Sequence, residues 1–344
     1  MGAWVGFAAD RAPDWRQANT RFHVTELLSI DPSAPNRTTW HTIPLSRTMF
    51  LARLRQLLEM IRFSHTLFAL PFAMLSAAMA WEANRRSDPP IPFRWQDLAG
   101  ILVCMVCARS AAMAFNRLAD RHLDALNPRT RLRHLPTKTL TVPAVATFTV
   151  ACSLGFIAGT LLFLPANPWP AYLALPVLGF LFAYSYTKRF TVFSHFWLGA
   201  ALMLAPMGAW VALRAELAWA PAILGGAVVL WVAGFDIIYA CQDIAFDRQM
   251  GLRSIPARLG AAHALRLAAG CHFGMVLLLL ALPAAYEPFG LIYYAGVAAI
   301  ALLLIYEHAI LRPDDLTRVN QAFFHVNAAV SLGLFGIGAV DLLL

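Results

Sequence analysis

Long runs of apolar residues separated by short polar segments dominate the chain from residue 63 onward. A run of roughly 20 apolar residues is long enough to cross the hydrocarbon core of a bilayer as a helix. That core offers the backbone no water to bond, so each run must be a helix or part of a closed barrel. Runs this continuous exclude the barrel, because apolar and polar residues alternate along the strands of a barrel. We predict nine spans, at 63–82, 97–116, 142–164, 169–186, 195–213, 219–240, 265–285, 289–310 and 322–343.

The composition agrees with an all-α integral membrane protein. Of the 344 residues, 59% are hydrophobic and only 13% are charged. Soluble globular domains carry about 25% charged and about 45–50% apolar residues. The apolar excess is too large for a single buried core, so we expect the lipid bilayer to be a partner of most of the chain.

The charge pattern predicts the topology. The formal net charge is +8, but the basic residues lie between the apolar runs, which argues against a nucleic-acid partner. With nine spans, these clusters fall on one side, and the positive-inside rule places that side and the N-terminus in the cytoplasm. We expect a bacterial inner membrane, with the functional site facing the cytoplasm. The clusters lie at 47–62, 121–138, 188–189, 248–258 and 312–318.

Residues 1–48 differ from the rest of the chain because they are polar and hold no apolar run. We expect a disordered or loosely attached cytoplasmic arm, without the pattern of a signal peptide. The membrane-proximal pattern begins just after Met49, which is an alternative start. Residues 49–344 are predicted to form one domain with no obligate protein partner.

Two acidic pairs stand at the ends of the second and sixth predicted spans. Asp120 and Asp124 follow Asn116 in the first segment, and Asp243 and Asp247 form the second pair. Both segments read D-x-x-x-D and precede an Arg-rich loop. They lie four spans apart and emerge on the same side, which indicates two related helical halves that face each other.

The spacing of each pair favours a metal ion. Residues four apart lie on one helix face, roughly 5–6 Å apart, so each pair brings two like charges together. Mg²⁺ commonly binds through one or two carboxylates plus substrate phosphates. We therefore predict a magnesium site at Asn116, Asp120, Asp124, Asp243 and Asp247. For one pair alone, a solvated helix end is an equal alternative.

Basic residues beside both pairs indicate a diphosphate. Arg and Lys bind phosphate oxygens through charge-assisted hydrogen bonds. Each alone is more typical of an anchor at the membrane surface, but as a set beside two acidic pairs they predict a diphosphate site. The candidates are Arg129, Arg131, Arg133, Lys188, Arg189, Arg253 and Arg258.

These motifs resemble those of the UbiA superfamily of intramembrane prenyltransferases. The family's motifs N-x-x-x-D-x-x-x-D, Y-x-x-x-K and D-x-x-x-D occur here in the same order, over residues 50–340. Arg253 is a departure, because many relatives have Lys there; the cation is kept but its geometry differs. The matching residues are Asn116, Asp120, Asp124, Tyr184, Lys188, Asp236, Tyr239, Asp243 and Asp247.

The resemblance implies a mechanism in which Mg²⁺ ions bridge the acidic pairs and the diphosphate of a polyprenyl donor. Departure of the diphosphate leaves an allylic cation that an electron-rich aromatic ring attacks. The implied catalytic residues are Asp120, Asp124, Asp243, Asp247, Asp236 and Lys188, and the implied diphosphate ligands are Asn116, Arg129, Arg131, Lys188 and Arg253.

Within the superfamily, the chain resembles quinone-pathway members. One group prenylates 4-hydroxybenzoate for ubiquinone. Another serves menaquinone made through futalosine and uses 1,4-dihydroxy-6-naphthoate; the segments at 62–73, 205–210 and 234–243 look more like this second group. A haem O synthase-like enzyme is a further alternative. The expected substrates are therefore a polyprenyl diphosphate and an aromatic acid.

Three residues are candidates for binding the acceptor. Arg62 opens the first span and is able to pair with a carboxylate, although an anchor at the membrane interface is the favoured alternative. The resemblance adds Tyr239 as an acceptor contact. Asp236 is a candidate to orient or deprotonate the acceptor, with helix packing as an equal alternative.

Other metal-ligating residue types are expected to be packing residues, because no H-x-x-H or H-E-x-x-H spacing occurs. This group comprises His65, His195, His325, Cys104 and Cys107. A polytopic transporter is the main alternative from another class. Transporter sites typically lie near the bilayer midplane on broken helices, whereas both acidic pairs here are predicted at helix ends.

Overall fold

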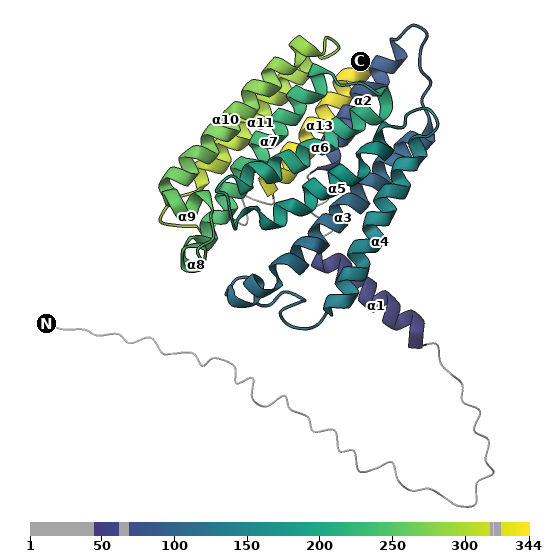
Figure 1. Cartoon of the computed structure of the whole chain (residues 1–344). Helices are drawn as coiled ribbons and strands as arrows, with labels where there is room; N and C mark the ends of the chain where they lie inside the picture. The colour runs from purple at the N-terminus through teal and green to yellow at the C-terminus, as the bar shows by residue number, and fades with distance from the viewer. Residues whose placement is uncertain (1–44, 62–68, 317–318, 320–324) are drawn as a thin grey trace, which may run out of the picture. The chain divides into compact units, whose positions relative to one another are not determined.

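The computed structural model describes residues 45–61, 69–316, 319 and 325–344 (Figure 1). These residues form helices and one isolated bridge between Arg312 and Asp315, with no strand among them. Residues Thr48–Leu344 form one compact unit. The predicted arm lies almost entirely outside the described residues, as do Arg62 and His65.

The long described helices overlap the predicted apolar runs, whereas the short helices lie outside them. The long ones are α2 (Leu70–Arg85), α3 (Trp95–Leu126), α4 (Val142–Thr160), α5 (Trp169–Thr187), α6 (Ser194–Arg214), α7 (Trp219–Ala240), α10 (Ala261–Ala285), α11 (Leu291–Ile310) and α13 (Asn327–Leu343). The others are α1 (Leu45–Met60), α8 (Ile244–Gln249), α9 (Ile255–Leu259) and the 3₁₀ turns η3 (Leu161–Phe163) and η4 (Cys241–Asp243).

Six of the described helices are long and apolar enough to cross a membrane, and the protein is an integral membrane protein. They begin at Trp95, Val142, Ser194, Trp219, Ala261 and Leu291. Helices α2, α13 and α5 are not among these six. They have 16, 17 and 19 residues, respectively. The count of nine spans and the cytoplasmic N-terminus therefore stay predictions.

Helix α7 lies at the centre of the bundle and packs against both α6 and α10. Its Trp231 is fully buried and contacts Phe72 of α2, with ring centroids 4.9 Å apart. The Trp231 indole also donates a 2.7 Å hydrogen bond to the Asn327 side chain at the start of α13. Buried indole N–H groups usually find such a partner, and this one ties α7 to the C-terminal helix.

Helix α3 is longer than a single crossing requires. Its 32 residues extend for about 48 Å at 1.5 Å per residue, against about 30 Å of hydrocarbon. Its polar C-terminal turns therefore project past the apolar part. In Figure 1 they reach the same end of the bundle as α8 and α9. The fold thus gathers both acidic motifs at one end.

Helices α6 and α7 approach closely at Gly199. A Cβ at this position would lie 2.5 Å from the Val229 carbonyl oxygen, which belongs to the backbone of α7 and is unable to turn away. We expect Gly199→Ala to destabilise the protein by about 1–3 kcal/mol through overpacking, measured as a lower thermal midpoint in detergent. Gly270→Ala is the matched control, because nothing lies within 4 Å of its added methyl group. Equal midpoints for the two variants would contradict this close contact.

Candidate active site

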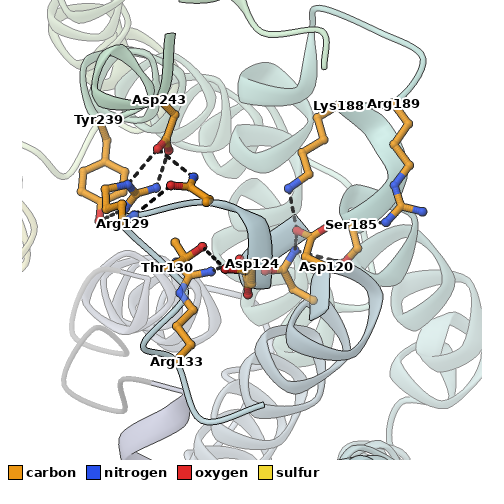
Figure 2. Close-up of polar contacts among 12 residues, drawn as sticks. Asp120, Asp124, Arg129, Thr130, Arg133, Ser185, Lys188, Arg189, Tyr239 and Asp243 are labelled. Carbon is orange, nitrogen blue, oxygen red and sulfur yellow. Dashed lines mark hydrogen bonds and ion pairs between the residues drawn. The ribbon is translucent and has the colours of Figure 1, made fainter. Parts of the chain in front are cut away.

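The first acidic motif lies in the last turns of α3 and is almost fully buried. Asp120 is 4% exposed and Asp124 is 6% exposed. Lys188, just after α5, donates a 2.7 Å hydrogen bond to Asp120 Oδ2, and the Asn116 amide donates to the same oxygen at 3.2 Å. Figure 2 shows Lys188 and Asp120 reaching toward each other from neighbouring helices. A buried carboxylate is stable here because it is paired and hydrogen-bonded.

The loop after α3 folds back on the same motif. Arg133 donates to Asp124 Oδ1 at 2.7 Å, and the Thr130 hydroxyl donates to the Asp124 carbonyl at 3.0 Å. Asp124 therefore holds the loop against the end of α3. Each carboxylate of the first pair thus has a cation of its own.

Arg129 joins the first motif's loop to the second motif. Its guanidinium makes a two-pronged ion pair with Asp243 and donates to the Tyr239 hydroxyl at 2.8 Å (Figure 2). The Asn127 amide donates to Asp243 Oδ1 at 3.1 Å. Burial alone would lower the pKa of Arg129, but the ion pair with Asp243 raises it above its ordinary value. The two motifs are therefore neighbours in space, although Asp124 and Asp243 are 119 residues apart in the sequence.

The second motif differs from the prediction of one helix face. Helix α7 ends at Ala240, and the 3₁₀ turn η4 separates it from the short helix α8, so Asp243 and Asp247 lie on different elements. Tight 3₁₀ turns are frequent at helix C-termini. Asp243 turns to Arg129, while Asp247 accepts a 2.7 Å hydrogen bond from Ser254, the N-cap of α9. The i,i+4 geometry thus holds for the first pair only.

Two of the predicted diphosphate ligands form no ion pair with the motif carboxylates in the described part of the chain. The Arg131 side chain is exposed and makes no hydrogen bond or ion pair within the described part of the chain. Arg253 donates to the Phe190 carbonyl at 2.7 Å, and its backbone N–H donates to the Lys188 carbonyl at 2.8 Å. Arg253 therefore holds the turn that carries Lys188. The predicted role of Arg62 lies outside the described residues.

His195, which the sequence predicts to be a packing residue, contacts the candidate residue Asp236. Its Nδ1 lies 2.7 Å from Asp236 Oδ2, and its buried Nε2 has no hydrogen-bond partner among the described residues. The pair links the first turn of α6 to α7. The two residues are 41 positions apart, so no spacing in the sequence indicates that they pair.

An apolar cavity of about 390 Å³ runs between α3, α4, α5 and α6. Asn116 and Tyr184 line it at the end near the acidic motif, and Leu217 and Phe163 line it toward the opposite ends of these helices. The few polar lining groups include Arg109, whose buried Nε has no hydrogen-bond partner in the described structure. Arg109 lies seven residues, or two helical turns, before Asn116 on α3. The cavity thus joins an acidic, cation-rich end to an apolar interior.

Comparison with known proteins places these features in one family. Residues 64–328 match the UbiA prenyltransferase family. A 4-hydroxybenzoate octaprenyltransferase of Pseudomonas aeruginosa (strain UCBPP-PA14) is 32% identical over 67% of this chain and 76% of that protein. One from Hydrogenovibrio crunogenus (strain DSM 25203 / XCL-2) is 31% identical over 67% of this chain and 80% of its own length.

Solved structures share the fold. A UbiA homolog from Aeropyrum pernix K1, solved without ligand, has a TM-score of 0.71 and 33% identity, covering 82% of this chain and 98% of that one. A UbiA homolog from Archaeoglobus fulgidus, bound to GPP and Mg²⁺, has a TM-score of 0.61 and 17% identity, covering 84% of this chain and all of that one. At this lower identity the likeness concerns the fold alone. Taken with the two acidic motifs at one end of an all-helical bundle, these matches mean that the chain belongs to the UbiA prenyltransferase family.

Proposed function

We propose that the protein transfers a polyprenyl chain from a polyprenyl diphosphate to the aromatic ring of 4-hydroxybenzoate, a step of quinone biosynthesis. The observation that carries the proposal is the apolar cavity that ends at Asn116, in the first acidic motif. A polyprenyl diphosphate has the same two parts, a hydrocarbon tail and a charged head. Names of the relatives favour 4-hydroxybenzoate over the naphthoate that local sequence similarity suggested.

The cavity suits the isoprenoid tail. Each buried CH₂ contributes about 0.8 kcal/mol, so a long tail is held mainly by apolar contact. The lining residues between α3 and α6 are almost all apolar, among them Ile101, Val177 and Leu202. In this arrangement the tail lies among the helices and the diphosphate lies at Asn116.

The acidic end suits the diphosphate and its metal. The donor set is rich in oxygen, because Asn116 Oδ1 remains available when its amide N–H₂ donates to Asp120. Asn116, Asp120, Asp124, Asp243 and Asp247 would hold Mg²⁺, a cation that prefers oxygen ligands. When bound, Mg²⁺ supplies positive charge that stabilises the departing diphosphate.

The basic side chains of the site are the second partner of the diphosphate. Lys188, Arg133 and Arg129 each pair with a motif carboxylate in the structure. Phosphate oxygens form equally strong charge-assisted bonds. Binding of the metal and the diphosphate would thus exchange partners within the cluster, with carboxylates on the metal and cations on the phosphate oxygens.

We assign Arg109 and Asp236 to the acceptor. The Arg109 guanidinium is a cation inside the cavity, and the carboxylate of 4-hydroxybenzoate is the complementary group. Asp236 is held by His195 at 2.7 Å. Its carboxylate is a candidate to orient the acceptor hydroxyl or to take a proton from it.

The bond changes are those of an aromatic alkylation. The C–O bond between the prenyl carbon and the diphosphate breaks, and the diphosphate leaves with the electron pair. A ring carbon of the acceptor forms the new C–C bond, and the proton on that carbon is then lost, which restores the aromatic ring. The Asp236–His195 pair is a candidate to receive it.

The proposal is tested with membranes that contain the protein, Mg²⁺, labelled octaprenyl diphosphate, and either 4-hydroxybenzoate or 1,4-dihydroxy-6-naphthoate. We expect labelled prenyl-4-hydroxybenzoate that disappears when EDTA is added. Control membranes without the protein should form none. Product with the naphthoate alone would overturn the acceptor assignment but keep prenyl transfer. Absence of product with both rings would contradict the proposed function.

A further inference from the structure

A second group of metal-ligating side chains lies apart from the acidic motifs, between α10 and α11. His272 belongs to α10, Glu307 and His308 belong to α11, and their ligand atoms all lie within 4.8 Å of one another. His272 is 2% exposed and Glu307 is fully buried. The proposed prenyl transfer uses none of the three.

The environment of Glu307 indicates that a ligand binds here. Neither of its carboxylate oxygens has a hydrogen-bond partner within the described part of the chain. Its closest ionisable contact is His272 Nδ1 at 3.5 Å, which is longer than a hydrogen bond to a charged group. A buried carboxylate without partners costs several kcal/mol. The side chain is nevertheless aimed at the two histidines rather than away from them.

The hydrogen bond of His272 Nε2 leaves the lone pair of the ring on Nδ1, which lies 3.0 Å from His308 Nε2 and 3.5 Å from Glu307 Oε2. Its Nε2 lies 3.3 Å from the Trp231 carbonyl of α7, which only an Nε2–H group is able to satisfy. In the neutral tautomer, Nδ1 then carries a lone pair, which accepts a 3.0 Å hydrogen bond from His308 Nε2–H; a bound cation would take the place of that proton. Metal-ligating histidines almost always donate their other ring N–H in this way, commonly to a backbone carbonyl.

We propose that His272 Nδ1, His308 Nε2 and the Glu307 carboxylate bind a transition-metal ion of the Zn²⁺ class. Two imidazoles with one carboxylate form a set that suits Zn²⁺, with a further position for water. Imidazole nitrogen is a poor ligand for Mg²⁺, so this site is chemically distinct from the acidic motifs. The ion links α10 to α11, and the hydrogen bond from His272 to the Trp231 carbonyl links the site to α7.

The test uses the full chain purified in detergent with excess Mg²⁺, which occupies the carboxylate sites. After dialysis we expect wild-type protein to retain about one Zn²⁺ per chain, and Co²⁺ in its place to give the visible absorption of nitrogen-ligated cobalt. Glu307→Gln should weaken Zn²⁺ binding by more than about 100-fold, since even outer ligands matter by 10- to 100-fold. His263→Gln is the matched control, an exposed histidine of the same helix, and should leave binding unchanged.

Thermal midpoints supply a second readout that does not depend on prenyl transfer. Zn²⁺ should raise the midpoint of wild type and His263→Gln, but not that of Glu307→Gln. The isosteric Gln removes a buried unpaired charge, so this variant is expected to fold. The proposal is overturned if wild type retains no Zn²⁺, or if Glu307→Gln retains as much as wild type. Loss of prenyl transfer alone would leave these metal measurements untouched.

Discussion

Replacing Asp120 with Asn should lower the turnover of prenyl transfer by about 1000-fold, at the upper end of the losses seen when one charge-stabilising group is removed. The two side chains have nearly the same shape, so the packing of α3 against α5 is kept. What is lost is the negative charge that Lys188 contacts at 2.7 Å and that would help to hold Mg²⁺. The measurement is kcat for octaprenyl transfer to 4-hydroxybenzoate over a series of Mg²⁺ concentrations.

Asp97→Asn is the matched control for this prediction. Asp97 lies at the opposite end of the same helix and pairs with Arg94 at 2.9 Å, far from the motif along the chain. We expect its activity to stay within about twofold of wild type, as for substitutions outside special sites. If Asp120→Asn kept more than a tenth of the wild-type turnover at every Mg²⁺ concentration, the first motif would not be the metal site.

The sequence alone was sufficient for the long helices and for the helical spacing of the first acidic motif. Apolar runs are local features, so each predicted span overlaps a long described helix, whereas α1, α8 and α9 lie outside the predicted spans. Asn116, Asp120 and Asp124 follow one another at a helical spacing, and α3 continues through all of them without a break. Local periodicity therefore determined both the element and the face that its acids share.

The second motif shows where local reasoning stops. The D-x-x-x-D spacing of Asp243 and Asp247 predicts one helix face, but Asp243 ends the 3₁₀ turn η4 whereas Asp247 lies in the next helix, α8. What decides their directions is contact with other segments: Arg129 from the α3–α4 loop holds Asp243, and Ser254 holds Asp247. Such long-range partners leave no periodic trace in the sequence.

The buried polar groups were missed for the same reason. Arg109, His195 and Glu307 stand in apolar runs where periodicity gives no sign of a partner. Polar groups inside membrane helices are costly and are usually functional. The signal that was available is therefore their residue type within a span, and a search for ionisable residues inside each predicted helix would have found all three.

Replacing Arg109 with Met should raise KM for 4-hydroxybenzoate by about 100-fold, and KM for octaprenyl diphosphate by less than about twofold. Met has a similar length but no charge, so the acceptor carboxylate loses its partner in an apolar cavity. Loss of one member of a buried charge pair costs about 2–5 kcal/mol, which corresponds to roughly 30- to 4000-fold in affinity and includes this change. The same substitution removes a buried Nε without a partner in the described structure and should not destabilise the fold. KM for both substrates and the thermal midpoint are the measurements.

A comparison of two acceptors isolates the charge. Wild-type protein should prefer 4-hydroxybenzoate strongly over its methyl ester, which has the same ring and hydroxyl but no negative charge. Arg109→Met should lose this preference, while Arg109→Lys should keep part of it, because Lys retains the charge without the guanidinium's two-pronged geometry. Arg121→Met, at an exposed position of the same helix, should behave like wild type. An unchanged preference of acid over ester in Arg109→Met would place the acceptor carboxylate elsewhere, and Arg62 would then be the next residue to change.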